Sequence, residues 1–253
     1  MNIGFIGAGN LGEKAIIRLS DKYDIFVSDP IEKDFLKDKT KGYFSFEETM
    51  NFCDLIFLTV KPNKLEELFK NLDLDTSSKV FISFIAGQSL NKIENLIGKE
   101  NKVARGMPTV GIGTGDSSIA ITANFDLAEE ETTKKILNEL GSTFEIEEKK
   151  FDAFTAIVGA GPAYFALLAE TLSEIAIKEG FDKPFDWINT LMLGTSKIYD
   201  EKKDIGFKEI MTMVASKGGV TEKALENMQE NGLKKIISDA IQMAITKSKE
   251  LGN

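Results

Sequence analysis

The chain has 253 residues, 42% of them hydrophobic, which is long enough for one large domain or two smaller ones with a buried core. Its 40 acidic and 31 basic residues give a net charge of −9, which argues against a nucleic-acid-binding surface and a polybasic membrane anchor. The sequence contains no histidine, which excludes imidazole acid–base catalysis and histidine-ligated zinc, so we expect no metal site.

Short apolar strands alternate with helices through the first part of the chain. We expect strands over residues 2–6, 24–28, 54–60, 79–85, 102–106, 118–122 and 143–147. Helices are expected at about 10–20, 31–39, 46–52, 62–71, 89–96 and 126–140. Ser45 and Glu48 form a capping box before the third of these helices. The alternation predicts an α/β fold with a doubly wound, mostly parallel sheet over residues 1–150.

Strand signals disappear after residue 150, which predicts a second, all-helical domain over residues 151–253. Its helices are expected from Pro162 to Gly180 and at about 184–200, 206–214, 221–231 and 233–250. Apolar residues such as Phe165 and Leu168 recur along the first of these helices. They exceed what a thin helical domain can bury alone, so we expect a homodimer built from the helices after residue 160.

The start of the sequence lacks the cationic segment and long apolar run of a signal peptide. No stretch approaches about 18 uninterrupted apolar residues. We therefore expect a cytoplasmic protein without a membrane partner. The single cysteine, Cys53, precedes an apolar run and is interpreted as a small core residue.

A G-x-G-x-x-G pattern at Gly7, Gly9 and Gly12 follows the first strand and opens a helix. The first glycine permits a tight turn, the second lets a pyrophosphate approach, and the third allows close helix–strand packing. This pattern in this context predicts a Rossmann-like dinucleotide-binding domain. Asp29 ends the second strand, where a carboxylate accepts hydrogen bonds from the ribose and disfavours a 2′-phosphate, so NADH is favoured over NADPH. The alternative is a turn aspartate before Pro30.

Other segments fall where strands end or helices begin. Lys61 and Pro62, like Ala86 and Gly87, follow strands at the carboxyl edge of the sheet, where ligands of such folds bind. The segment 158–164 places small residues before a helix, so a backbone or a ligand can approach closely. The segment 216–221 precedes a helix expected to begin at Glu222 and predicts an anion site for a carboxylate. The alternative for each is an ordinary turn or capped glycine loop.

Five blocks of the chain, taken in order, resemble the pyrroline-5-carboxylate reductase family. They are IGFIGAGNLG, FLTVKP (57–62), ISFIAGQSL (82–90), DAFTAIVGAGPAYFALLAETL (152–172) and ASKGGVTEKALENMQENG (215–232). The resemblance implies reduction of (S)-1-pyrroline-5-carboxylate to L-proline, the last step of proline biosynthesis, with NADH or NADPH. It also implies a homodimer whose active sites are completed across the interface, and it allows larger rings of dimers.

Carried over position by position, the resemblance implies two groups of site residues. Those contacting the dinucleotide would be Ile6, Gly7, Ala8, Gly9, Asn10, Leu11, Thr59, Val60, Lys61, Pro62, Ala86 and Gly87. Those contacting the small-molecule substrate would be Ser216, Gly218, Gly219, Val220, Thr221 and Glu148. Among them, Thr221 would be the catalytic residue that hydrogen-bonds the ring nitrogen. A cyclic imine is basic enough to bind already protonated, so this chemistry is compatible with the absence of histidine.

The chain departs from the family pattern in three places. Met107–Gly111 stands where the family has M-P-N-T-P, Lys217 replaces the proline of S-P-G-G-T-T, and 158–161 lacks both serines of S-G-S-G. One alternative is therefore a related reductase acting on another imine or keto acid. The other is a non-catalytic protein that senses a dinucleotide or proline, since a fold alone does not establish catalysis.

Overall fold

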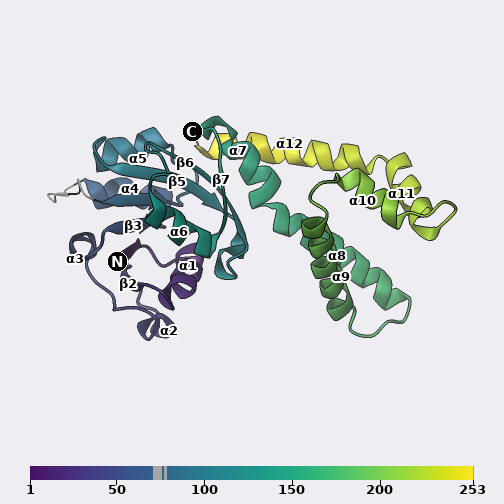
Figure 1. Ribbon diagram of the computed structural model, residues 1–253, viewed down its shortest axis with the longest axis horizontal. Helices are drawn as coiled ribbons and strands as arrows, with labels where there is room; N and C mark the ends of the chain where they lie inside the picture. Colours follow the sequence, from purple (N-terminus) through teal and green to yellow (C-terminus); the bar gives the residue numbers. More distant parts are fainter. Residues whose placement is uncertain (71–75, 77–78, 253) are drawn as a thin grey trace. The chain divides into compact units, whose positions relative to one another are not determined.

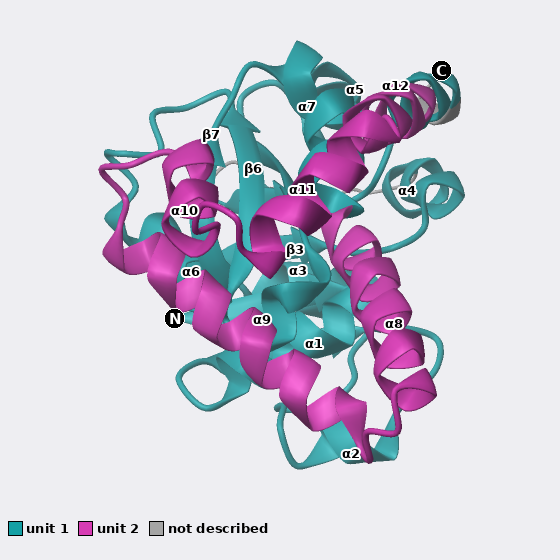
Figure 2. Ribbon diagram, turned by 90° about the vertical axis from the view of Figure 1, so that its right-hand side faces the viewer, with its two compact units in different colours: residues 1–160, 244–253 teal, residues 161–243 magenta. Residues whose placement is uncertain are grey.

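The computed structural model describes residues 1–70, 76 and 79–252, which fall into two compact units (Figure 2). The first unit comprises Met1–Ala160 and Ala244–Asn253, and the second comprises Gly161–Met243. The first unit continues beyond residue 150 because Phe151 and Ala156 are buried within it. The boundary between the compact units therefore lies ten residues after the expected domain boundary at residue 150. The division of the chain into a dinucleotide-binding domain and a helical domain with separate functions stays a prediction.

Among the described residues, seven strands of the first unit form one sheet in the order β2-β1-β3-β4-β5-β6-β7 (Figure 1). Their bounds are β1 Asn2–Ile6, β2 Asp24–Ser28, β3 Leu55–Leu58, β4 Val80–Ser83, β5 Lys102–Pro108, β6 Ser117–Ala123 and β7 Gly141–Glu145. Strands β1 to β5 are parallel, β6 is antiparallel to β5, and β7 is parallel to β6. The predicted doubly wound, mostly parallel sheet is confirmed.

Helices cover both faces of this sheet. They are α1 Asn10–Ser20, α2 Asp34–Lys37, α3 Phe46–Phe52, α4 Pro62–Phe69, α5 Leu90–Ile97 and α6 Glu131–Leu140. The predicted end of the fourth helix near residue 71 lies outside the described residues. The predicted capping box is confirmed, because Ser45 Oγ accepts from Glu48 N at 3.1 Å and Glu48 Oε2 accepts from Ser45 N at 2.9 Å.

The core consists of two apolar clusters, one on each face, because strand side chains alternate in direction. Phe57 of β3 joins the cluster that includes α1 and α6, whereas its neighbour Leu58 joins the cluster of α3, α4 and α5. Cys53 belongs to the second cluster and is buried, which confirms its interpretation as a core residue. Burial raises the pKa of its thiol to about 12.

The second unit is helical. It contains α8 Gly161–Lys178, α9 Pro184–Glu201, α10 Phe207–Val214, α11 Val220–Glu230 and most of α12 Leu233–Gly252. Before α8 the first unit ends in α7 Phe151–Phe154 and a π-helical turn, η3 Thr155–Gly159. The predicted helical character of this region is confirmed.

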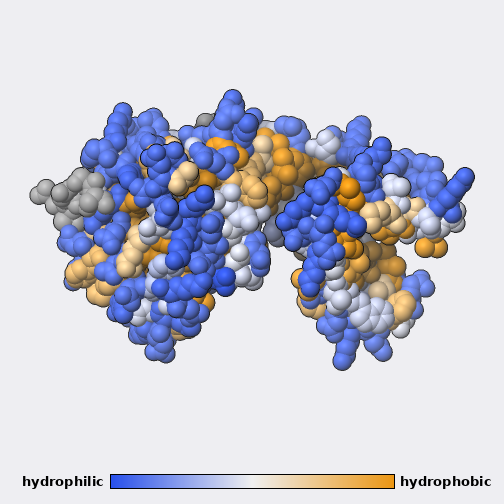
Figure 3. Space-filling view, viewed as in Figure 1, coloured by the Kyte–Doolittle hydropathy of each residue, from blue (hydrophilic) through white to orange (hydrophobic). Residues whose placement is uncertain are grey.

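Large apolar side chains are exposed along the second unit, where Figure 3 shows apolar surface. Between α8 and α9 they line a groove of about 390 Å³, formed by Phe165, Leu168, Ala169, Leu172, Ile188, Leu191, Met192, Thr195, Ser196 and Tyr199. Among the described residues, one helical stretch, Glu148–Lys178, is long and apolar enough to span a membrane, judged by length and composition alone. Such a helix also serves as an association surface in soluble proteins.

Candidate functional site

The glycine turn between β1 and α1 is held tightly against the end of β3. Gly7 has a φ of +102°, and a Cβ there would lie 2.9 Å from the carbonyl group of Thr59. A Cβ on Gly12 would lie 2.6 Å from Gly7 O. Thr59 Oγ1 donates to the same Gly7 carbonyl at 2.6 Å. The first and third glycines are therefore required by close packing, as the pattern predicts.

Gly9 stands in a different environment. A Cβ added to Gly9 would meet nothing within 4 Å, and Gly9 is the N-cap of α1. Because Gly9 has no side chain to cap them, the first-turn N–H groups of α1 are left for a ligand at the carboxyl edge of the sheet. This arrangement fits the pyrophosphate of a dinucleotide.

Asp29 binds the glycine turn directly. Its Oδ2 accepts from Ala8 N at 2.7 Å, and its Oδ1 accepts from Ile31 N at 2.8 Å. The carboxylate thus shapes the loop after β2, as the turn interpretation predicts, and each oxygen keeps a second lone pair for a ribose hydroxyl. The nearest following cation, Lys33, forms an ion pair with Glu13 of α1.

The other candidate dinucleotide residues lie at neighbouring strand ends. Lys61 is the N-cap of α4 and Pro62 is its first residue, directly after β3. Gly87 follows β4 with a φ of +70°. Because β1, β3 and β4 are adjacent and parallel, these segments share one edge of the sheet with the glycine turn. Gln88 follows Gly87 and was not predicted as a site residue; it is buried, and its Oε1 has no partner among the described residues.

Glu148 forms an ion pair that the sequence analysis missed. Its Oε1 accepts from Arg105 Nη1 and from Leu90 N, both at 2.7 Å. The Arg105 guanidinium also lies over the Phe151 ring, 4.4 Å from its centroid. Glu148 therefore connects β5 to the N-terminus of α5. This end of α5 follows Ala86 and Gly87 closely in sequence. A lone arginine within an apolar strand was the signal that could have revealed this pair.

Two of the segments that depart from the family pattern, those containing Met107 and Gly159, lie side by side in the first unit. A Cβ on Gly159 of η3 would lie 3.9 Å from Met107 Cε of β5. Beyond Met107 the chain turns inward, because Thr109 is buried and its N–H donates to Ser117 Oγ at 2.9 Å. The polar side chain at position 109 thus hydrogen-bonds to β6, and the altered loop packs next to α1.

The candidate substrate loop, residues 216–221, belongs to the second unit. Helix α11 begins at Val220, so the expected start at Glu222 is wrong and Thr221 lies in the first helical turn. Gly219 N donates to Ser216 O at 2.9 Å, and a Cβ on Gly219 would lie 2.6 Å from Ser216 Oγ. Gly218 has a φ of +74°, and its N–H donates to Glu222 Oε2 at 2.6 Å. The loop is a tight turn that requires glycine at both positions.

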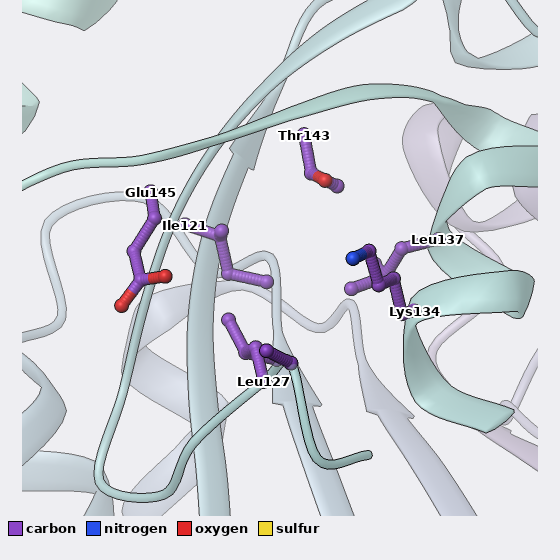
Figure 4. A pocket seen from close by; sticks show the side chains of 7 residues that line it. Ile121, Leu127, Lys134, Leu137, Thr143 and Glu145 are labelled. Atoms are coloured by element: carbon purple, nitrogen blue, oxygen red, sulfur yellow. The ribbon is translucent and has the colours of Figure 1, made fainter. Parts of the chain in front are cut away.

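A hollow of about 200 Å³ lies away from these segments, beside the outer strands β6 and β7 (Figure 4). Ile121 and Leu127 line it between Lys134 and Glu145, which lie on opposite sides. In the sheet order, β3, β4 and β5 separate these strands from the glycine turn. This hollow is therefore distinct from the dinucleotide edge.

A mostly parallel sheet whose glycine turn, helix N-termini and Asp29 meet at one edge is the architecture of a dinucleotide-binding domain. Together with the relatives that the chain resembles, it identifies a nicotinamide-dependent oxidoreductase. A model of the NADP oxidoreductase domain described as coenzyme F420-dependent matches residues 2–87, and a model of pyrroline-5-carboxylate reductase dimerisation matches residues 148–251. Across both parts, the chain is similar to the pyrroline-5-carboxylate reductase family.

Full-length relatives support this assignment. The pyrroline-5-carboxylate reductase of Aquifex aeolicus is 29% identical, with 99% of this chain and 97% of the relative covered. The Plasmodium falciparum pyrroline carboxylate reductase, solved with NADP bound, has a TM-score of 0.88 at 28% identity, covering 100% of this chain and 98% of that one. The Streptococcus pyogenes enzyme has a TM-score of 0.86 at 27% identity, covering 99% and 98%.

Proposed function

We propose that this chain reduces (S)-1-pyrroline-5-carboxylate to L-proline with a nicotinamide cofactor, the last step of proline biosynthesis. The observation that carries the proposal is the combination, in one chain, of an open first turn of α1 at Gly9 with the 216–221 loop. The first supplies N–H groups for the pyrophosphate, and the second supplies N–H groups for the substrate carboxylate.

The protein's contribution to this reaction is orientation. Bound NADH or NADPH supplies the hydride, and the imine arrives protonated, so no strong protein acid is needed. The N–H groups of Gly218, Val220 and Thr221 and the Ser216 hydroxyl hold the carboxylate, whereas the Gly219 N–H stays bonded to Ser216 O within the turn. The Thr221 hydroxyl then accepts a hydrogen bond from the iminium nitrogen and fixes the ring. Such positioning supplies up to about 7–11 kcal/mol of barrier lowering in ideal cases.

We propose a preference for NADH, which rests on Asp29. Its carboxylate remains at the end of β2 and would repel a 2′-phosphate, while Lys33 is engaged by Glu13 and does not offset that charge. In Asp29→Ser, the ratio of kcat/KM for NADH to that for NADPH should fall. An unchanged ratio would make Asp29 a turn residue only. Asp126→Ser is the matched control, because Asp126 is an exposed aspartate that accepts from a backbone N–H in the loop after β6.

We propose that the exposed helices of the second unit form a homodimer, on which a ring of dimers can be built, and that the protein works in the cytoplasm. The groove between α8 and α9 and the apolar stretch Glu148–Lys178 are then covered by a second copy rather than by lipid. Glu148 and Thr221, from different units of the chain, are proposed to face the substrate in that assembly.

The decisive experiment follows cofactor absorbance with purified protein, each cofactor and synthetic pyrroline-5-carboxylate. Thr221→Ala should lower kcat/KM by the factor that corresponds to a loss of about 1.5–3 kcal/mol of transition-state stabilisation. The affinity for the dinucleotide should stay unchanged. Thr132→Ala, the same change at an exposed threonine of α6, is the matched control. Turnover of another imine or keto acid alone would favour the related-reductase alternative, and binding without any turnover would favour a sensor.

A further inference from the structure

The loop before α11 already holds a carboxylate from the chain itself. Gly218 N donates to Glu222 Oε2 at 2.6 Å, in the range of charge-assisted hydrogen bonds. The left-handed conformation of Gly218 and the Ser216–Gly219 turn direct this N–H toward the helix. Glu222 is half-buried over the first turn of α11.

The same N–H is one of those assigned above to the substrate carboxylate. A backbone N–H makes one strong hydrogen bond, and two carboxylates at hydrogen-bond distance from it repel each other. A substrate that carries a carboxylate must therefore displace Glu222 from Gly218. A substrate without a carboxylate has no such contact to make and leaves Glu222 in place.

We propose that Glu222 is a specificity-determining residue that competes with the substrate carboxylate for the Gly218 N–H. This proposal rests on the proposed function. Glu222 raises KM only for substrates that bear a carboxylate. It therefore reduces the preference for an acidic imine over a neutral one. Release of Glu222 on binding requires its side chain to turn away from the Gly218 N–H.

Helix capping is an alternative explanation for the position of Glu222. Capping and competition predict opposite changes in KM when Glu222 is removed. It is the third residue after the N-cap Gly219, the position from which a glutamate reaches back to cap a helix. If capping were its only role, removing it would loosen the loop and raise KM for the substrate. Competition requires KM to fall.

The test compares Glu222→Ala, Glu222→Gln and Glu226→Ala with the unchanged protein at saturating cofactor. Substrates are pyrroline-5-carboxylate and 1-pyrroline, the same ring without the carboxylate. In Glu222→Ala, KM for the acid should fall roughly three- to tenfold, with kcat within about twofold and no change for 1-pyrroline. Glu222→Gln, which keeps a neutral cap, should shift KM in the same direction. Glu226 pairs with Lys223 one turn further along α11, so its variant carries the same charge change without the Gly218 contact.

Calorimetric titration with L-proline and oxidised cofactor separates this proposal from the proposed function. Tighter proline binding by Glu222→Ala supports the competition even if no variant turns over. Turnover with an unchanged or raised KM overturns the competition and leaves the proposed function intact. An equal effect of Glu226→Ala, or an equal shift for 1-pyrroline, also overturns it. Absence of both turnover and tighter proline binding overturns both.

Discussion

The first and third glycines of the turn differ from the second in how they should respond to alanine. In Gly12→Ala, the new methyl group would lie 2.6 Å from Gly7 O and 2.9 Å from Thr59 Oγ1. These distances are too short for contacts with carbon, so α1 must move away from the turn and the Thr59–Gly7 hydrogen bond must lengthen. In Gly9→Ala, the methyl group enters open space.

The magnitudes follow from these contacts. Overpacking at Gly12 costs about 1–3 kcal/mol, and the weakened hydrogen bond costs about 1 kcal/mol more. The higher helix propensity of alanine offsets about 1 kcal/mol. We expect Gly12→Ala to lose about 1–3 kcal/mol of unfolding free energy, which lowers Tm by roughly 2–4 °C per kcal/mol. Gly9→Ala should lose less, about 0.5–1 kcal/mol, because alanine is a poorer N-cap residue than glycine but meets no close contact.

Cofactor titration gives the complementary result. The Gly9 methyl group stands where a pyrophosphate approaches the first-turn N–H groups, so Kd for the cofactor should rise at least about tenfold, or about 1.4 kcal/mol. Denaturant unfolding and fluorescence titration with the reduced cofactor measure the two quantities. The reasoning fails if Gly9→Ala binds the cofactor normally, or if Gly12→Ala is as stable as the unchanged protein.

Three further outcomes are expected. The Cys53 thiol, with its pKa raised to about 12 from 9.0, should resist thiol reagents at pH 8 until the chain unfolds. Rapid labelling of the folded protein at pH 8 would contradict this. Because the thiol ionises first in the unfolded chain, its contribution to the free energy of unfolding is present below pH 9 and is lost as the pH rises from 9 to about 12. Glu148→Ala should cost about 2 kcal/mol in denaturant unfolding, because Arg105 loses a charged partner, and an unchanged midpoint would refute this. Replacing Phe165 and Leu168 with glutamate should convert the dimer into a monomer by light scattering, whereas an unchanged mass would place the interface elsewhere.

The fold was predictable because its sequence signals are local. The alternation of short apolar strands with amphipathic helices, the glycine turn and the Ser45–Glu48 capping box each depend on residues a few positions apart. The shared edge of β1, β3 and β4 then follows from parallel topology. The candidate dinucleotide segments could therefore be grouped before any contact was known.

The partners of individual side chains were not predictable in this way. Arg105 and Glu148 are separated by 43 positions, and their pairing depends on how η2, Glu148–Lys150, returns to the sheet. The start of α11 depended on a turn at Gly218, whose backbone conformation no sequence pattern specifies uniquely. The two segments that depart from the family pattern, at 107–111 and 158–161, are neighbours only in three dimensions, where Met107 lies close to Gly159.

The path of α12 has a consequence for synthesis of the protein. This helix begins in the second unit, but residues from Ala244 onward pack with the first, where Ser248 Oγ donates to Asp152 Oδ1 at 2.7 Å. On the ribosome, the sheet and its helices emerge early, whereas this last piece of the first unit emerges only after the whole second unit has been made. The Asp152 side chain therefore gains its Ser248 partner only after residues 161–243 have been translated. Completion of the first unit thus follows translation of the second.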